Sequence, residues 1–447
     1  MLVRVRDFFK SRTCSSAKFS IFNFQFSIYF VPLQSEMKDV IKRYITKVAL
    51  TILFGLAVFC FWMFVRPELV VEREAIQLFL WNSDYLMSRI VIPGGLARYI
   101  AEFLVQYFMS EAGGACVIAV LLVLVQRLTW VLLRRCFPSV MEMTLSVISF
   151  LPSVALWYLL CDMDTSMTLL VSVLLTLSLL MLLPSKRNTS LLCSFVLIPI
   201  GYWIVGPIVF FVALFHLRWL RLPAKKVRVW TESVAMMLLL VACVVVSSYF
   251  VPYSLSNMAK GIDYFSIQRG KIGTLEMMEY DYLQRKKAWE MIVGKAAKEE
   301  PHSRSCVNVV CLAKYYQGLM SPDALRESLR EPYKSLTSAT SAMMMSDIFF
   351  QMGFVNFSQR AVFEAMESAS NYNKSGRALC RLTETALVTG QYEVALKYIS
   401  LLEETLFYRR WAMYMRQFVD HPESIKDHPK YGPLQKIYSE TEDGMFI

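Results

Sequence analysis

The sequence predicts an all-α protein: a polytopic transmembrane helical bundle of about five spans plus a short helical hairpin, followed by an α-solenoid. Two observations carry this prediction. Hydrophobic residues make up 55% of the 447 residues, against roughly 45–50% in soluble chains, and the long apolar stretches stop near Val251. After Pro252 the chain turns polar, and Gly318, Gly353 and Gly390 recur between amphipathic segments.

The excess positive charge belongs to the part of the chain before residue 252. Residues 252–447 carry 24 Lys and Arg against 23 Asp and Glu, so +10 of the net charge of +11 lies in the apolar half. Basic residues gathered in the connectors between spans follow the positive-inside rule of membrane proteins. A nucleic-acid-binding protein would carry its basic residues on one face of a soluble domain, so we do not expect nucleic acid as a partner.

Residues 1–36 differ from the rest of the chain. They contain an alternating aromatic run, FSIFNFQFSIYF, that is too short to cross a bilayer and has no signal-peptide cleavage site after it. Met37 then opens a basic flank suited to a first membrane helix. We predict that residues 1–36 are not native or are disordered, with an interfacial anchor as the alternative. The transmembrane domain is predicted over 37–251.

Five apolar stretches are each close to the ~20 residues that cross a bilayer. Basic residues flank them on alternate sides, and the turn after the third stretch, Cys161-Asp162-Met163-Asp164, is acidic. This alternation places the N-terminal flank on the inner side. The predicted spans are 48–65, 113–133, 140–160, 166–183 and 234–251.

A further apolar stretch, residues 190–217, is predicted to be a hairpin of two short helices. As a single span it would place the five basic residues of the next connector on the outer side, against the positive-inside rule. Two prolines and two glycines between Pro199 and Pro207 favour a break. The hairpin puts residues 252–447 on the outer face, the periplasm of a Gram-negative cell. One long tilted span would instead leave them in the cytoplasm.

The connector between the first two spans, residues 66–112, is the longest, and we call it the long loop. It has two amphipathic halves around a Pro-Gly-Gly turn at 93–95. In the second half Arg98, Glu102 and Gln106 share one face of the expected helix at spacing i, i+4, i+8. Such a helix pair serves either as a lid on the bundle or as a surface that receives a substrate at the membrane interface.

The glycines after residue 252 mark the expected solenoid. They lie 35 and 37 residues apart, and the clearest unit, residues 379–404, has its turn at Gly390-Gln391-Tyr392. This pattern resembles the tetratricopeptide repeat, a helix–turn–helix unit of ~34 residues. Three or four such pairs predict a helical-repeat soluble domain over 252–419 and a polar C-terminal tail over 420–447. A plain helical bundle with coincidental glycines is the alternative.

Four short segments carry a resemblance to a family. They read PGGLA at 93–97, YDYL at 280–283, QMGFVN at 351–356 and LFYRRWA at 406–412. On these segments the chain resembles an uncharacterised family of bacterial multi-pass inner-membrane proteins with a C-terminal tetratricopeptide-like domain. The resemblance covers residues 37–411 and implies a location in the bacterial inner membrane, without an established activity.

The architecture also has a distant similarity to the GT-C glycosyltransferases. These enzymes combine a multi-helix membrane domain with a long first outer loop, and they transfer a sugar from a polyprenyl-phosphate donor. A carboxylate in that loop acts as general base or positions a metal. The similarity implies Asp84 as the first candidate catalytic residue, with Glu102, Glu72 and Glu74 as alternatives.

Arg98 and Gln106 are the candidate substrate-binding residues, because they share the helix face of Glu102. The chain departs from the GT-C pattern in two ways: the long loop has no Asp-Glu pair, and the spans are fewer than usual. The cysteines and the four histidines form no metal-binding pattern, so no metal site is predicted and the cofactor is left open.

Two functions from different classes follow. The first is a GT-C-like transferase that uses a lipid-linked sugar at the outer face of the membrane. The second is a non-catalytic, membrane-anchored scaffold whose helical repeats recruit a protein partner in the envelope. A transporter is less favoured, because the spans carry almost no charge and show no paired broken helices. The lipid bilayer is the expected partner in every case.

Overall fold

The computed structural model describes residues 45–221, 226–265, 273–330, 332–368 and 374–441. Within these ranges the regular secondary structure is helical and no strand forms, which confirms the all-α prediction. The segment 1–36, predicted to be non-native or disordered, lies outside the described residues.

Among the described residues, five helices are long and apolar enough to cross a membrane. Two shorter apolar helices, Met167–Leu182 and Pro207–Leu220, complete the bundle, so the predicted fourth span is one of the short ones. The five long helices are Ile45–Val65, which ends in η2 (Phe61–Val65); α5 (Glu111–Cys136); Glu142–Leu160, which comprises α6 (Glu142–Ile148) and α7 (Leu151–Leu160); α9 (Arg187–Val205); and α11 (Lys226–Ser247). The first short helix contains α8 (Met167–Met181).

The predicted break inside residues 190–217 is present, but it falls late in the segment. Pro199 lies inside α9, and the helix continues to Val205. Gly206 then takes a left-handed φ of 83°, which glycine adopts without steric cost. The chain continues as η4 (Pro207–Phe210), α10 (Phe211–His216) and η5 (Leu217–Arg221), which pack on α9 and α11. The first arm of the hairpin is therefore a full-length helix and the second arm is short.

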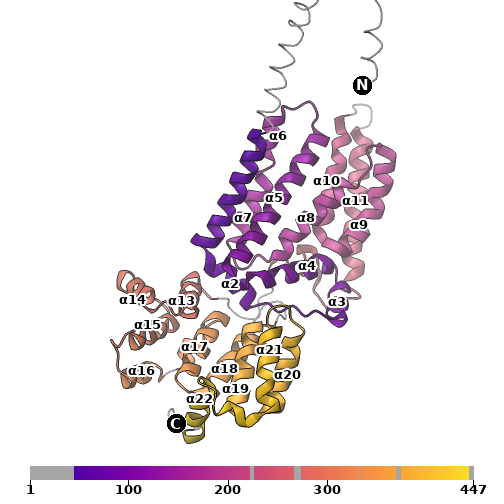
Figure 1. Cartoon of the computed structure of the whole chain (residues 1–447). Helices are drawn as coiled ribbons and strands as arrows, with labels where there is room; N and C mark the ends of the chain where they lie inside the picture. The colour runs from indigo at the N-terminus through magenta and orange to yellow at the C-terminus, as the bar shows by residue number, and fades with distance from the viewer. Residues whose placement is uncertain (1–44, 222–225, 266–272, 331, 369–373, 442–447) are drawn as a thin grey trace, which may run out of the picture.

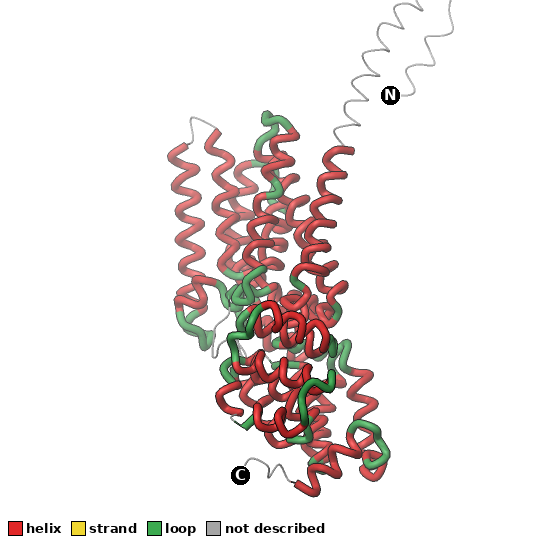
Figure 2. The backbone as a smooth tube through the Cα atoms, turned by 90° about the vertical axis from the view of Figure 1, so that its left-hand side faces the viewer, coloured by secondary structure: helices red, strands yellow, loops and turns green. Residues whose placement is uncertain are grey.

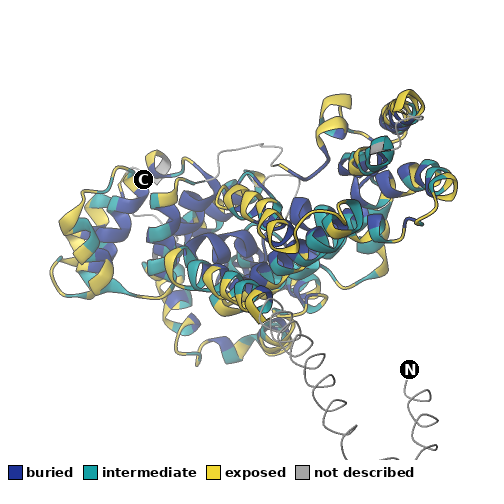
Figure 3. Ribbon diagram, turned by 90° about the horizontal axis from the view of Figure 1, so that it is seen from above, coloured by how far each residue is buried: buried dark blue, intermediate teal, exposed yellow. Residues whose placement is uncertain are grey.

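The outer faces of the bundle are apolar. Large side chains such as Ile52, Leu56, Leu238 and Val241 are more than half exposed. Seen along the bundle, buried residues gather in the interior and exposed ones lie at the periphery (Figure 3). Soluble monomers rarely expose apolar surface on this scale, so the faces fit contact with lipid.

The long loop folds against one end of the bundle. It forms α2 (Pro67–Ala75), α3 (Ser83–Ile90), α4 (Gly95–Val105) and η3 (Gln106–Met109). The Pro-Gly-Gly turn is held by the hairpin, because the N–H of Gly94 donates to the carbonyl of Trp203 at 2.9 Å. The described residues between 275 and 441 form the helical domain, which lies beneath the same end of the bundle (Figures 1 and 2).

The helical domain is a succession of helices joined by short turns. Gly318, Gly353 and Gly390 have φ of 72°, 86° and 77°, and each lies between two helices, which confirms the predicted turns. A short helix, α12 (Leu255–Lys260), precedes the domain. The domain itself comprises α13 (Leu275–Arg285), α14 (Trp289–Lys298), α15 (Arg304–Tyr316), α16 (Pro322–Ser328), η7 (Pro332–Ser335), α17 (Ala339–Gln351), α18 (Val355–Glu367), α19 (Gly376–Val388), α20 (Tyr392–Glu403), α21 (Arg409–Asp420), η9 (Pro422–Ile425) and α22 (Tyr431–Thr441).

The segment expected to be a polar tail is folded as far as Thr441. Ile425, Tyr431 and Leu434 are buried in the same hydrophobic core as α19 and α21. These three residues are spaced so that one face of the segment is apolar, and α22 therefore folds back onto α19. This difference matters for function, because α22 becomes one wall of the cleft described below.

The long loop and the helical domain share a buried interface. Helix α2 packs on α13 and α19, and Leu78 belongs to the core of the helical domain. The hydroxyl of Thr340 donates to the Glu72 carboxylate at 2.6 Å, and the hydroxyl of Tyr408 donates to Glu74 at 2.6 Å. The helical domain therefore packs against the membrane half through a buried interface.

Candidate functional site

Glu102 lies at the centre of a buried charge cluster on α4. Its side chain is fully buried, and both carboxylate oxygens are occupied. One oxygen accepts from Arg98 Nε at 2.8 Å; the other accepts from Arg89 Nε at 2.9 Å and from the Tyr85 hydroxyl at 2.7 Å. Two predicted site residues, Glu102 and Arg98, are thus brought together.

Asp263 completes this cluster from the segment before the helical domain. Its carboxylate lies 3.2 Å from Arg98 Nε and accepts from the Thr168 hydroxyl on α8 at 3.4 Å. Burial raises the pKa of Asp263, and the charge of Arg98 opposes that shift. These contacts fix the positions of the Asp263 and Glu102 carboxylates. The cluster joins α3, α4 and α8, and a catalytic role of Glu102 stays a prediction.

Asp84 and Gln106 lie apart from that cluster. Asp84 is exposed on the first turn of α3, beside the helix cap formed when Asn82 Oδ1 accepts from the N–H of Tyr85 at 2.7 Å. Asn82 also donates through Nδ2 to Glu404 at 2.5 Å. Gln106 accepts from the N–H of Leu406 at 3.4 Å. Both predicted residues therefore lie at the junction with the loop after α20.

Glu72 and Glu74, the alternative carboxylates, are buried in the interface. Burial raises the pKa of Glu72, and the nearby charge of Asp281 raises it further. Burial also raises the pKa of Glu74, whose second oxygen has no hydrogen-bond partner among the described residues. Both carboxyls feel the positive charge of Arg285. These groups bind the long loop to the helical domain.

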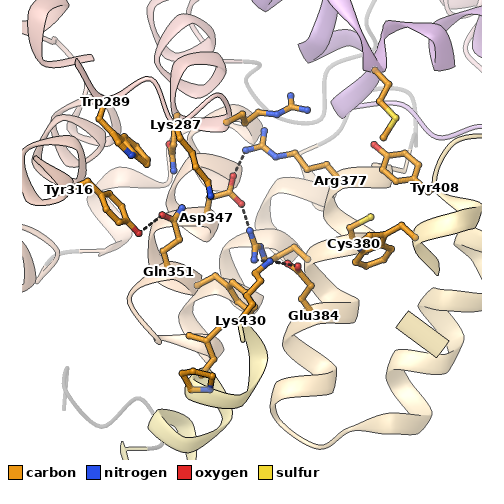
Figure 4. A pocket seen from close by; sticks show the side chains of 18 of the residues that line it. Lys287, Trp289, Tyr316, Asp347, Gln351, Arg377, Cys380, Glu384, Tyr408 and Lys430 are labelled. Atoms are coloured by element: carbon orange, nitrogen blue, oxygen red, sulfur yellow. Dashed lines mark hydrogen bonds and ion pairs between the residues drawn. The ribbon is translucent and has the colours of Figure 1, made fainter. Parts of the chain in front are cut away.

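A cleft of about 830 Å³ opens in the helical domain, and Figure 4 shows side chains that line it. Its walls come from α13, α14, α15, α17, α19, α21 and α22, and Met109 of the long loop is also a lining residue. This volume is in the usual range for sites that bind small molecules. The cleft is lined by both charged and aromatic side chains.

Six charged side chains form a continuous network along the cleft. Burial alone would raise the pKa of Asp347, but the charges of Arg377 and Arg381 outweigh it and lower that pKa. Arg377 also binds Asp281 through two hydrogen bonds of 2.7 and 2.8 Å. The three cations are Arg377, Arg381 and Lys430, and the three anions are Asp281, Asp347 and Glu384. This network is electrically balanced.

Two more cations line the cleft outside that network. Arg285 is half-buried at the end of α13, and Lys287 is exposed just after it. Neither side chain forms a hydrogen bond or ion pair with a described residue. Beside them Trp289 and Tyr316 stack, with ring centroids 4.8 Å apart and planes 14° from parallel. The cleft therefore offers positive charge next to an aromatic wall.

The described residues contain no cluster of three or more His, Cys, Asp or Glu side chains arranged to hold a metal ion. Cys380, which lines the cleft, is a thiol whose pKa burial raises well above its usual range. Nucleophilic chemistry by this cysteine is accordingly disfavoured, because the thiolate is the reactive form.

A family model described as "Family of unknown function (DUF6057)" matches residues 42–447. The chain belongs to this family. No curated protein and no solved structure gives a significant match. Membership agrees with the uncharacterised family expected from the sequence, and it brings no activity with it.

The cleft of this DUF6057 member was not predicted from its sequence. Lys430 lies more than 140 residues after Arg285 and Lys287 in the sequence, and none of the three belongs to a recognisable motif. The YDYL segment at 280–283 was a partial signal, because it contains Asp281 and ends two residues before Arg285. The candidate site therefore has two parts: the exposed Asp84 region and the cleft.

Proposed function

We propose that this protein binds a lipid-linked ligand in the cleft of its helical domain. The observation that carries the proposal is that Met109, two residues before the start of α5, is one of the residues that line the cleft. A headgroup attached to a lipid in the bilayer would reach this cleft without leaving the membrane.

The reaction that fits best is that of a GT-C-like transferase with a polyprenyl-phosphate sugar as donor. Asp84 would act as general base and take the proton of an acceptor hydroxyl. The bond between the sugar and the phosphate would break, the acceptor oxygen would bond to the sugar, and the polyprenyl phosphate would leave. Asp84 suits this role better than Glu102, since its carboxylate is exposed and Glu102 is fully engaged.

The setting proposed for this reaction is the outer face of a bacterial inner membrane, with the helical domain in the periplasm. Support comes from the basic connectors on the opposite side, which the positive-inside rule assigns to the cytoplasm. A periplasm-dependent reporter fused after Ile447 tests this: an active reporter is expected, and an inactive one contradicts the orientation.

Photo-crosslinking tests the binding step. The full chain in lipid nanodiscs is exposed to decaprenyl phosphate that bears one hexose and a photoreactive group. Crosslinked peptides are expected from α19, α21 and α22. Crosslinks confined to the lipid-facing sides of the bundle would contradict the proposal. For the reaction, Asp84→Asn is expected to abolish transfer of labelled hexose in membranes, whereas Asp323→Asn, an exposed carboxylate on α16, is not.

The second candidate, a non-catalytic scaffold, has one observation in its favour. The helical domain repeats helix pairs with left-handed glycine turns, as tetratricopeptide-like proteins do, and such arrays commonly bind partner proteins. Affinity capture with the full chain should then recover one envelope protein, and the Asp84→Asn variant should recover it equally well. Loss of capture on that change would favour the transferase.

A further inference from the structure

Arg285 and Lys287 are the two cleft cations whose charge the neighbouring network leaves uncompensated. The network of three cations and three anions beside them is neutral, as its ion pairs show. Glu72 and Glu74 are acidic groups near Arg285, and their carboxylates accept hydrogen bonds from Thr340 and Tyr408 and form no ion pair with Arg285. Arg285 and Lys287 therefore bring two positive charges to one end of the cleft, and neither forms an ion pair with a described residue.

The backbone at Lys287 supports a role for its side chain. Lys287 has a φ of 53°, in the left-handed region that glycine or asparagine adopts at lower cost. The carbonyl of Lys287 accepts from the N–H of Trp289 at 2.9 Å, and this tight turn brings Trp289 against Tyr316. A lysine in a position that favours glycine points to a function of the ammonium group.

The aromatic pair has a polar neighbour that faces the same cleft. The Tyr316 hydroxyl donates to Gln351 Oε1 at 2.9 Å, which leaves the amide nitrogen of Gln351 without a partner among the described residues. Figure 4 shows Lys287, Trp289, Tyr316 and Gln351 on one side of the cleft, with Arg377 and Lys430 across from them. Positive charge, a ring surface and a free amide donor therefore lie together.

We propose that Arg285 and Lys287 form a phosphate-binding subsite, and that the ligand is a phosphate or diphosphate ester whose attached group packs on Trp289 and Tyr316. A phosphate monoester carries roughly −1.5 to −2 at neutral pH, which matches the excess charge of the subsite. Arginine binds phosphate oxygens through paired N–H groups, and lysine adds a point charge. The subsite depends on the proposed function only for the lipid source of that phosphate.

The ligand phosphate can come from a lipid or from a soluble compound, and the test separates the two. The full chain in nanodiscs is titrated with decaprenyl phosphate, with decaprenol, and with inorganic pyrophosphate. Binding is followed as the rise in the thermal transition temperature, because a ligand of the folded state stabilises it by mass action. Decaprenyl phosphate is expected to raise the transition temperature and decaprenol is not.

Two double variants assign the effect to the subsite. Arg285→Gln/Lys287→Gln is expected to need at least about tenfold more decaprenyl phosphate for the same shift, since it removes charge-assisted contacts. Lys298→Gln/Lys314→Gln, which changes two exposed lysines outside the cleft, should titrate like the unchanged chain. Lys287→Gly should weaken binding without lowering the transition temperature of the ligand-free protein, and this separates binding from folding.

Three outcomes would decide the matter. The subsite would be overturned if Arg285→Gln/Lys287→Gln and the unchanged chain needed the same concentration of decaprenyl phosphate for the same rise in transition temperature. It would also be overturned if decaprenol and decaprenyl phosphate raised the transition temperature equally. Crosslinking of the lipid probe in the cleft would then leave the proposed function standing. A shift with pyrophosphate but not with decaprenyl phosphate would support the subsite and contradict the lipid-linked ligand.

Discussion

Replacing Arg377 by methionine is expected to destabilise the helical domain more than any other single charge removal in the cleft. Its guanidinium makes two hydrogen bonds to Asp281 and one of 2.5 Å to Asp347. Asp281 is 2% exposed and has no other ion pair among the described residues. Arg377→Met therefore leaves one buried carboxylate unpaired and a second with Arg381 alone.

Breaking a buried ion pair by removing one partner costs about 3–5 kcal/mol. For a folded unit of this size, each kcal/mol lowers the transition temperature by about 2–4 °C. The expected loss is thus about 6–20 °C, measured by differential scanning fluorimetry of the full chain in detergent. Adding Asp281→Asn should recover part of the loss, because it removes the unpaired charge.

Arg326→Met provides the matched control. Arg326 pairs with Asp323 at the surface of α16, with both side chains at least half exposed, and such pairs contribute about 0–1 kcal/mol. A loss for Arg377→Met no larger than that for Arg326→Met would refute the reasoning that the network is buried and coupled.

Further predictions concern the interface and the turns. Burial raises the pKa of Glu72 above its ordinary value of 4.5, so the folded state keeps a proton that the unfolded state loses above pH 4.5. The free energy of unfolding should therefore fall as the pH rises from 4.5 towards the raised pKa. Glu72→Gln should flatten this part of the pH profile, measured as the denaturant midpoint at each pH. Glu102→Leu should lower the transition temperature sharply, since it removes the carboxylate partner of Arg89 and leaves Arg98 with Asp263 alone, and a change under 2 °C by fluorimetry would contradict this. Gly206→Ala should destabilise the hairpin, because φ is 83° and a Cβ would lie 2.8 Å from the Tyr264 hydroxyl; a transition temperature equal to that of the unchanged chain would speak against the turn.

Local conformation was predictable from the sequence where backbone chemistry decides it. The turns at Gly318, Gly353 and Gly390 follow from the left-handed φ that glycine accepts readily. The hairpin break was also expected, yet Pro199 is tolerated inside α9 and the turn falls at Gly206. Tertiary packing decides whether the chain turns at Pro199 or at Gly206, and the hydrophobic periodicity of the sequence carries no information about that packing.

The candidate site was less predictable. The i, i+4 spacing of Arg98 and Glu102 correctly placed them on one face, but the third partner, Asp263, comes from a distant segment. The excess charge of the cleft depends on which cations are paired, and pairing is a property of tertiary structure. Asp84 could be named from the sequence as a carboxylate in the long loop, while its role stays a prediction.

The interface of α2 also sets an order of events during synthesis. Glu74 bonds to Tyr408, a residue 334 positions later in the chain. At a synthesis rate of about 5–20 residues per second, α2 waits roughly 17–67 s for this partner. During that interval the side chains of Glu72 and Glu74 are solvated, and with Glu68 and Arg73 of the same helix they disfavour entry of α2 into the bilayer. Glu72 and Glu74 are costly to bury in the finished fold, but before Tyr408 has been synthesised they keep α2 at the membrane surface.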